Sequence, residues 1–381
     1  MRENWTYKKL GEVCEVVMGQ SPDGDSINEK EGTEFHQGKT CFGDRFLTHS
    51  HLYTSKPAKY AEANSVLLCV RAPVGFPNIT QRRICIGRGL CSLSCKKEII
   101  NMFLYYSLLG KQAYFEKNST GSTFKAISSK IVSNTTIPIP SLSEQQSVVS
   151  ELDKINELIS LKKAQLSDLD ALAQSIFYDM FGDPIENEKG WEVKKLGEIS
   201  TVKTGPFGSM LHKDDYISNG IPLVNPIHIK DYRIVADVNF TISSEKAKEL
   251  NNYILRRNDV IFARRGDIGR CAVVSDVEDG YLCGTGSLFV RFEHKVIPQY
   301  IMYIIRSSSF IKELISKAKG ATMLNLNSTI IADLQIPLPP LSLQQDFAKK
   351  IELIEQQKAQ INSTIKDLET LLASRMQYWF D

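Results

Sequence analysis

The sequence lacks several features by which common classes of protein are recognised. Its 381 residues contain no apolar run of about 18, the length that a membrane-spanning helix needs. The segment Met1–Trp5 is polar and charged where a secretory leader would be apolar, so we expect a cytoplasmic protein with no membrane partner. Hydrophobic residues make up 42% of the chain, too many for a disordered protein, and the length favours two domains.

Catalytic motifs are also missing. The end of a phosphate-binding loop occurs at Gly38-Lys39-Thr40, but Thr33 stands where that loop needs its first glycine. Asn225–His228 and Asp183–Ile185 begin like the motif of an amino-methyltransferase but lack its second proline and its aromatic residue. No glycine pattern of a dinucleotide or methyl-donor site follows a strand, and the six histidines form neither a triad nor a metal pattern. We therefore expect no catalytic residue and no cofactor in this chain.

Cysteine is present, but its spacing gives little support to a metal site. The eight cysteines are expected to be thiols in a reducing cytosol. Cys91 and Cys95 lie four apart, which leaves zinc binding as an alternative. However, the segment between them alternates apolar and polar residues as a half-buried strand does, and no second ligand pair lies nearby at zinc-ligand spacing. We predict cysteines in a buried strand and no metal.

The main positive signal is an internal repeat. Trp5–Val13 returns as Trp191–Ile199 at an offset of 186, and Ile137–Gln146 returns as Ile336–Gln345 at an offset of 199. The ends of the repeat match well, whereas the interiors match poorly and differ in length. A shared frame with two different interiors suggests that one task is performed twice on two different targets.

A helix is expected after each proline-rich end of the repeat. Ser143 and Gln146 have capping-box spacing, and Ser342 and Gln345 repeat it. Apolar residues then recur with a period of 3.5 over about five heptads, which predicts an antiparallel coiled coil; the alternative is two helices that each lie on their own domain. The seam residues are Leu152, Ile155, Ile159, Leu166, Leu169 and Ile176 in the first helix and Ile351, Ile354, Ile361, Ile365, Leu368 and Leu372 in the second.

Both halves of the repeat have a mixed pattern of short strands and helices. Strands are expected at Ser65–Arg71, Cys91–Cys95, Val260–Ala263 and Leu288–Phe292, and helices at Ile99–Ser107 and Pro298–Lys319. We therefore predict an α+β protein. Its two globular mixed α/β domains, residues 1–142 and 184–341, would be separated by two long helices, residues 143–183 and 342–381, which form the coiled coil.

Charge is distributed unevenly along the chain. The net charge is +6 over residues 1–142 and −5 over residues 143–183. Residues 63–97 contain no acidic side chain. Arginine presents a planar donor fork that suits phosphate and the edge of guanine, so nucleic acid is a reasonable partner, although a solvated basic surface remains the alternative. The basic residues in question are Arg71, Arg82, Arg83, Arg88, Lys96 and Lys97 in the first half and Arg256, Arg257, Arg264, Arg265 and Arg270 in the second.

In their order, duplication and spacing these motifs resemble the specificity subunits of type I restriction-modification systems, over essentially the whole chain. The resemblance is carried by the Trp-x-x-x-x-Leu-Gly-Glu openings, the Ile-Pro-[Ile/Leu]-Pro…Leu-Ser-x-x-Gln-Gln entries, the long helices after them, and the Arg-x-x-x-Gly turns at Arg71–Gly75 and Arg265–Gly269. It implies two target recognition domains, each reading half of a bipartite site in double-stranded DNA, with the helices as a ruler.

The resemblance also implies partners. The helices, through the seam residues, would dock two methyltransferase subunits, which bring S-adenosylmethionine and methylate adenine, and restriction (motor-nuclease) subunits can join them. Two alternatives remain: a specificity subunit of a stand-alone (orphan) adenine methyltransferase complex, and a non-enzymatic coiled-coil assembly protein. The assembly protein would not need matched arginine clusters in its globular parts.

Family members bind DNA mainly through loops of the recognition domains, and the resemblance assigns that role by position. Thr322-Met323 departs from Thr123-Phe124 of the first half, so this loop could serve different purposes in the two halves. The implied DNA-binding residues are Gln20, Ser21, Lys39, Thr40, Arg45, Arg71, Arg88, Ser122, Thr123 and Lys125 in the first half and Phe207, Ser209, His228, Arg264, Arg265, Arg270 and Thr322 in the second.

Overall fold

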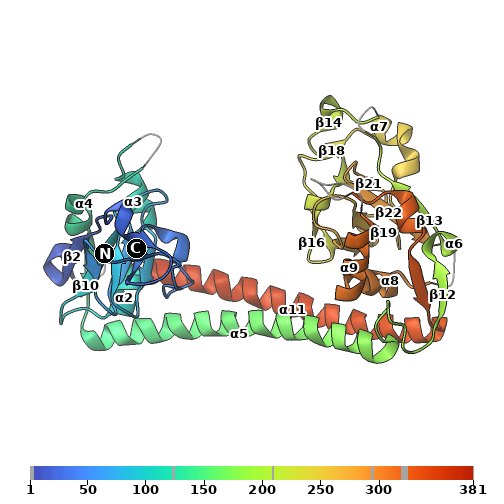
Figure 1. Cartoon of the computed structure of the whole chain (residues 1–381). Coiled ribbons are helices and arrows are strands. Elements are labelled where there is room, and N and C mark those ends of the chain that lie inside the picture. The colour runs from blue at the N-terminus through green and yellow to red at the C-terminus, as the bar shows by residue number, and fades with distance from the viewer. Residues whose placement is uncertain (1–3, 122–124, 208–209, 293–295, 319–324, 381) are drawn as a thin grey trace. The chain divides into compact units, whose positions relative to one another are not determined.

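The computed structural model describes residues 4–121, 125–207, 210–292, 296–318 and 325–380, and these form two compact units. Unit 1 comprises residues 1–164 and 362–381, and unit 2 comprises residues 165–361. Each unit therefore contains one half of the repeat, the first part of the long helix that follows it, and the last part of the other long helix (Figure 1).

The two halves share a frame of two antiparallel sheets. In each, the strand that begins the half pairs with the strand that ends it, and a second sheet of four strands lies between them in sequence. In unit 1 these are β1 (Thr6–Lys9) with β11 (Thr136–Ile139), and β2 (Cys14–Met18), β10 (Leu90–Cys95), β7 (Val66–Cys69) and β8 (Pro77–Ile79) in that order. In unit 2 they are β12 (Glu192–Lys195) with β23 (Gln335–Leu338), and β13 (Ser200–Thr204), β22 (Ser287–Phe292), β19 (Val260–Ala263) and β20 (Cys271–Val273).

The interiors of the repeat form further sheets, and these differ between the halves. Unit 1 has one insert sheet of five short strands, in the order β3 (Ile27–Asn28), β5 (Tyr53–Thr54), β4 (Thr33–His36), β9 (Ile84–Ile86) and β6 (Tyr60–Ala61). Unit 2 has the sheet β14 (Tyr216–Ile217), β18 (Thr241–Ile242), β15 (Ile221–Val224) and β21 (Leu282–Cys283), and the separate hairpin of β16 (Ile229–Lys230) and β17 (Arg233–Ile234). The poor sequence match of the interiors thus corresponds to a real difference in structure.

Short helices pack against the sheets of both units. In unit 1 they are α1 (Leu10–Val13), α2 (Asn101–Leu109), α3 (Gln112–Lys117) and α4 (Ser129–Asn134), and in unit 2 they are α6 (Leu196–Ile199), α7 (Ser244–Glu249), α8 (Pro298–Arg306), α9 (Ser308–Lys317) and α10 (Ser328–Ala332). The prediction of one continuous helix over Pro298–Lys319 was wrong, because the segment forms two helices, α8 and α9. Ser307 interrupts it because its backbone is extended and its side chain caps α9 by accepting from the Phe310 amide.

The long helices are α5 (Leu142–Phe181) and α11 (Leu341–Phe380), and each is 40 residues long. The predicted capping box of the first helix was wrong by two residues. Ser141 is the cap, since its backbone amide and hydroxyl donate to Glu144, whose own amide donates to the Ser141 hydroxyl. α5 ends at Phe181, and Gly182 follows with a φ of +76°, a conformation that glycine adopts without strain.

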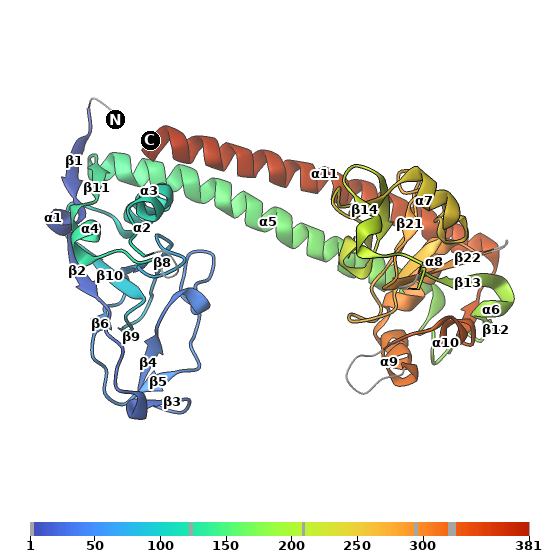
Figure 2. The same ribbon diagram turned by 90° about the horizontal axis from the view of Figure 1, so that it is seen from above.

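Within each unit the two long helices lie side by side, antiparallel (Figures 1 and 2). In unit 1, Glu151 near the start of α5 pairs with Arg375 near the end of α11; in unit 2, Asp170 pairs with Lys358. The predicted packing of the two long helices against each other is confirmed. Buried seam residues are Leu152, Ile155, Ile159 and Ile365 in unit 1 and Ile351, Ile354 and Ile361 in unit 2, while Leu166, Leu169, Ile176, Leu368 and Leu372 are partly buried.

Aromatic side chains pack the frame of each unit onto these helices. In unit 1, Trp5 stacks on Trp379 of α11 with ring centroids 5.8 Å apart, and Phe380 joins the core around Phe103. In unit 2, Phe177 and Phe181 of α5 and Phe347 of α11 pack around Tyr300 and Tyr303. The frame of each unit and its helices therefore share one hydrophobic core.

Candidate nucleic-acid interface

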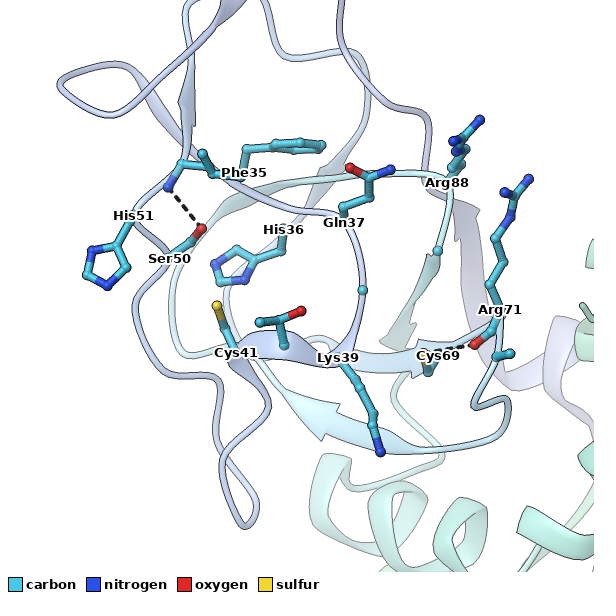
Figure 3. A pocket seen from close by; sticks show the side chains of 15 residues that line it. Phe35, His36, Gln37, Lys39, Cys41, Ser50, His51, Cys69, Arg71 and Arg88 are labelled. Carbon is cyan, nitrogen blue, oxygen red and sulfur yellow. Dashed lines mark hydrogen bonds between the residues drawn. The ribbon is translucent and has the colours of Figure 1, made fainter. Parts of the chain in front are cut away.

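A cavity of about 550 Å³ lies in unit 1 where the insert sheet meets the four-stranded sheet. Four residues predicted to bind DNA line it, namely Lys39, Thr40, Arg71 and Arg88. Figure 3 shows that the three cations come from three separate segments, with Arg71 and Arg88 pointing to the same side and Lys39 pointing to the opposite side. The fold has therefore brought together side chains that are up to 49 residues apart in the sequence.

Each cation is placed by the end of a strand. Lys39 begins a 3-10 helix, Lys39–Cys41, that follows β4, and its ammonium lies 4.2 Å from the centroid of the Phe76 ring. Arg71 follows β7, and Arg88 lies in the turn between β9 and β10. Within the described parts of the chain, none of the three forms an ion pair, and all three are exposed. Their positive charge is thus available to an anion such as a phosphate group.

The carboxylate of Glu34, whose side chain is 10% exposed, holds residues of one wall of the cavity in place. It accepts two hydrogen bonds from Arg82, both 2.6 Å long, one from His36 at 2.9 Å, and one from the Ser50 amide at 2.7 Å. Burial alone would raise the pKa of Glu34, but these donors lower it to about 2. Burial also lowers the pKa of His36. Arg82, which belongs to the acid-free stretch of sequence, is therefore a structural residue.

Glycines allow the backbone segments beside the cavity to approach closely. A Cβ atom on Gly19 would lie 2.1 Å from the carbonyl oxygen of Gly87, and one on Gly89 would lie 2.2 Å from that of Gln37. The second half repeats the first contact, since a Cβ on Gly205 would lie 1.9 Å from the oxygen of Gly284. These glycines therefore permit close contact between protein strands.

The other predicted residues of the first half are spread around the insert. Gln20 and Lys125 are exposed, and Ser21 is half-buried. Arg45 is half-buried and donates to Asp153 of α5 at 2.7 Å. Ser122 and Thr123 lie outside the described residues.

The arginines of the second half have different surroundings. Arg264 is 6% exposed and donates to Asn325 at 3.2 Å, and burial lowers its pKa. Arg270 is bound internally by the Asp267 carboxylate at 2.7 Å and the Pro226 carbonyl at 3.1 Å. Arg265 is exposed. The matched clusters in the sequence are thus not matched in charge at the surface.

Two further predictions of the second half concern residues of other types. His228 is 4% exposed, its Nδ1 accepts from the Asn225 amide at 3.1 Å, and burial lowers its pKa. Phe207 is 60% exposed. Ser209 and Thr322 lie outside the described residues.

A cavity of about 420 Å³ is present in unit 2 beside Arg270. It lies between the β16–β17 hairpin and the Arg265–Gly269 turn, and its lining combines Lys230 and Arg270 with Asp231 and Asp267. Because its lining carries both positive and negative charges, this cavity attracts a polyanion less strongly than the unit 1 cavity does.

Comparison with known proteins identifies the architecture. Residues 2–171 and 188–370 match the family model described as the type I restriction modification DNA specificity domain. The chain belongs to this family. It is a specificity subunit of a type I restriction-modification system, which is the non-catalytic subunit of the enzyme.

Relatives are found in both sequence and structure. The type I restriction enzyme MjaIX specificity subunit of Methanocaldococcus jannaschii is 25% identical, over 92% of this chain and 86% of the relative. A second specificity subunit of that archaeon, MjaX, is 37% identical over 46% of this chain and 42% of its own length. A chain from a structure on complex assembly and conformational transition of a type I R-M system superposes with a TM-score of 0.65 at 17% identity, covering 100% of this chain and 98% of that one.

Sequence reasoning missed several residues of this specificity subunit. Gln37 and His51 line the unit 1 cavity, and Lys230 and Tyr232 line that of unit 2. Gln37 directly follows β4, and Lys230 and Tyr232 lie in the hairpin after the 3-10 helix Pro226–His228. The signal that could have found them is their place after a strand or 3-10 helix of the insert, next to residues already selected.

The described residues contain no group of three or more His, Cys, Asp or Glu side chains that could hold a metal ion, and no helix among them could cross a membrane. Cys91 and Cys95 lie in β10, as the strand prediction requires. Cys95 faces Cys14 across the β2–β10 pair, and a hydrogen bond to Cys14 together with burial raises the pKa of Cys95. All eight cysteines are thiols.

Proposed function

We propose that each half of this specificity subunit reads one part of a bipartite site in double-stranded DNA, and that the helix pair sets the spacing of the two parts. The observation that carries the proposal is the unit 1 cavity, which is lined by Lys39, Arg71 and Arg88, three exposed cations without an ion-pair partner among the described residues. Cations so placed bind phosphate oxygens, and an arginine fork can also bind the edge of guanine.

The two halves would contribute unequally to affinity. In unit 1 three cations are available, whereas in unit 2 Arg264 and Arg270 are held by internal hydrogen bonds. Each phosphate contact releases counterions and makes binding sensitive to salt. The first half would therefore supply most of the salt-dependent binding, and the second half would depend more on exposed groups such as Arg265 and Phe207.

The helix pair would also dock the methyltransferase subunits. Because the seam residues are covered by the opposite helix, exposed leucines are better candidates for this role than the seam itself. Leu172 and Leu371 occupy equivalent positions, 199 residues apart, and are 49% and 45% exposed. Leu158 and Leu161 accompany Leu371 in unit 1, at 47% and 59% exposed. Equivalent apolar residues on the two helices fit two copies of one partner, which would bring the S-adenosylmethionine for adenine methylation.

The test is methylation by the assembled complex. The chain would be expressed with the methyltransferase subunits of the same genome, and methylated adenines would be mapped by sequencing. We expect a bipartite methylated motif that disappears when this gene is deleted. Arg71→Glu or Arg88→Glu should reduce methylation at least about tenfold, since charge reversal replaces an attraction to phosphate with a repulsion. Lys130→Glu, an exposed substitution on α4 outside the cavity, is the matched control.

Each outcome has a distinct meaning. Unchanged methylation in both arginine variants would remove the cavity from the DNA interface. A genome-wide methylation pattern that does not depend on this gene would instead overturn the proposed reading of a bipartite site by this chain. Methylation without any restriction of unmodified DNA would favour the orphan methyltransferase complex.

A further inference from the structure

Each half of the repeat carries a hairpin directly after a 3-10 helix of its insert. The hairpins span residues 42–47 and 229–234, and each is closed by backbone pairing of its ends, Phe42 with Leu47 and Ile229 with Ile234. Both hairpins hold an arginine that is paired with an acid on the long helix that follows that half. Neither contact belongs to the cavity residues described above.

In unit 1 the contact is made by Arg45. Its guanidinium donates to Asp153 of α5 at 2.7 Å, and Tyr106 of α2 donates to the same carboxylate oxygen at 2.6 Å. Asn156, one turn further along α5, donates to the Tyr106 hydroxyl at 3.2 Å. The arginine thus ends in a hydrogen-bond network that joins the insert, the frame and the long helix.

The hairpin itself is fixed to the frame by its backbone. The Asp44 carbonyl accepts from Tyr105 at 2.9 Å, and the Gly43 carbonyl accepts from Asn78 at 2.9 Å. The hairpin follows Lys39 and Thr40, which line the cationic cavity, after an interval of only a few residues. A movement of the hairpin on the helix would therefore be transmitted to the cavity.

In unit 2 Arg233 pairs with Glu355 of α11. Lys358 donates to the other carboxylate oxygen at 2.9 Å, and the Arg306 guanidinium lies 3.6 Å from the centroid of the Tyr232 ring in the same hairpin. Burial would raise the pKa of Glu355, but hydrogen bonds from Arg233 and Lys358 lower it. The acid is therefore charged at neutral pH, as the contact requires.

The two contacts are not copies of one another. With the closing pairs of the hairpins aligned, Arg233 stands where the first hairpin has Phe46, and Arg45 corresponds to Tyr232. On the helices, Glu355 corresponds by the offset of 199 to Asn156 and not to Asp153. The halves make the same link with different residues, which indicates that the link itself is needed.

Stability is a weak explanation for these links. The side chains of Arg45 and Asp153 are 23% and 37% exposed, and those of Arg233 and Glu355 are 51% and 36% exposed. Ion pairs so accessible to water contribute about 0–1 kcal/mol. A role in orientation is a better explanation of these links, because an arginine that bridges two elements limits the angle between them.

We propose that Arg45–Asp153 and Arg233–Glu355 are tethers that fix the angle of each DNA-reading insert on its long helix, and so make the protein strict about spacer length. The inference rests on the proposed reading of a bipartite site. A shift of the reading loops by about 3.4 Å along the DNA corresponds to one base pair. A small rotation of an insert on its helix would be enough to admit a spacer one base pair too long or too short.

The tethers can be tested with the methyltransferase complex and synthetic duplexes. The duplexes carry the half-sites found for the wild type, separated by the natural spacer or by a spacer one base pair shorter or longer. Arg45→Met and Arg233→Met remove the charge and keep the side-chain stem. We expect each variant to raise methylation of the altered spacers relative to the natural one by about fivefold, the effect of losing one such ion pair. The preferred bases of both half-sites should stay unchanged.

Two further variants make the result specific. Arg83→Met removes another exposed ion pair of unit 1, with Glu62, that does not involve a long helix, and it should leave spacer preference as in the wild type. Arg45→Lys keeps the charge opposite Asp153 and should restore strictness. A variant that loses only stability would lower methylation of all spacers equally and would not change their ratio.

The outcomes separate the inference from the function on which it rests. Wild-type strictness in both methionine variants, or equal loss at every spacer, would overturn the tethers. If Arg45→Met fails to assemble, Arg233→Met decides the question. Failure of the wild-type complex to methylate any bipartite site would instead overturn the proposed function.

Discussion

Arginines that look alike in the sequence have different roles in the fold. Arg71 and Arg88 are exposed and line the unit 1 cavity, whereas Arg82, from the same acid-free stretch, is bound by Glu34. Glu34 lies 48 residues before Arg82. Arg264 is similarly bound through Asn325. A local count of charges cannot reveal such pairs, because the partner comes from another strand.

The Glu34 cluster makes a prediction about pH. In the folded chain the pKa of Glu34 is about 2, against an ordinary value of 4.5, so the ionised form is the one that the fold favours. Its contribution is fully present above pH 4.5 and is lost as the pH falls toward 2. Glu34→Gln should lower the stability of unit 1 by about 2 kcal/mol at pH 7 and by much less near pH 2.

The measurement is urea unfolding followed by tryptophan fluorescence. In a Trp191→Phe background the remaining tryptophans, Trp5 and Trp379, both lie in unit 1. Because the lowered pKa links stability to pH, the difference in unfolding free energy between the parent and Glu34→Gln should shrink as the pH falls. A difference that is the same at every pH would contradict the assignment of the charge to Glu34.

The glycine pairs make a second prediction at this scale. A Cβ on Gly19 would meet the Gly87 carbonyl oxygen at 2.1 Å, and backbone must move to relieve that contact. Gly19→Ala should destabilise unit 1 by about 1–3 kcal/mol, as overpacking does. Gly24→Ala is the control, because a Cβ there meets no atom within 4 Å. Thermal unfolding of the two variants compares them, and equal melting temperatures would show that the backbones can separate.

At the scale of elements, the start of each long helix is held by one glutamine. Gln145 is fully buried; its amide donates to the carbonyls of Glu98 and Pro140, both at 2.9 Å, and its oxygen accepts from the Ile100 amide at 2.9 Å. Gln344 makes the equivalent bonds to Pro339 and Ile297. The Leu-Ser-x-x-Gln-Gln motif thus connects the long helix to α2 or α8, and its first glutamine makes the hydrogen bonds of this connection.

Substitution of neighbouring glutamines tests this joint. Gln145→Ala leaves the Ile100 amide and two carbonyls without a protein partner, so we expect a loss of about 1–3 kcal/mol. Gln146→Ala, at an exposed position, should change stability by less than about 0.5 kcal/mol. Urea unfolding of the two proteins gives the comparison. Similar losses for both would mean that the motif only favours the helix and does not anchor it.

At the scale of the whole molecule, one frame occurs twice and carries two different inserts. Each unit takes the first part of its own long helix and the last part of the other. Both halves are therefore connected through helices that belong to both cores. Such an arrangement suits a protein that must hold two independent readers at a set interval, as the proposed function requires.

A prediction at the scale of the whole molecule concerns the length of the helix pair. Four residues inserted after Lys162 in α5, with four inserted opposite in α11, lengthen each helix by about 6 Å at roughly 1.5 Å per residue. The spacer of the methylated site should grow by about one or two base pairs at roughly 3.4 Å each, with both half-sites unchanged. Four residues slightly exceed one helical turn of about 3.6 residues, so the apolar seam beyond the insertion is rotated by only about 40° about the helix axis.

Insertions of two residues provide the contrast. They turn the seam by about 200° and place its apolar residues on the wrong face, so they should abolish methylation. Sequencing of methylated sites scores both designs. An unchanged spacer length in the four-residue design would show that the helices do not set the interval between the half-sites. Their proposed role would then be limited to docking the methyltransferase subunits.

The sequence by itself determined the repeat, the mixed α and β composition, the seam of the two long helices and the absence of a recognisable catalytic motif. These are periodic or local properties, and the hydrophobic pattern of a helix or strand is visible in a short window. The start of α5 was misplaced because Ser143 and Gln146 have the same spacing as the true capping pair, Ser141 and Glu144.

Only the tertiary structure decided which cations are available and which are bound. The partners of Arg82, Arg45 and Arg233 lie between 48 and 122 residues away, on other elements. It also decided that Gly19 separates two protein strands and that Gln145, not Gln146, joins helix to frame. These facts depend on contacts between distant segments, and one sequence carries no local signal for such contacts.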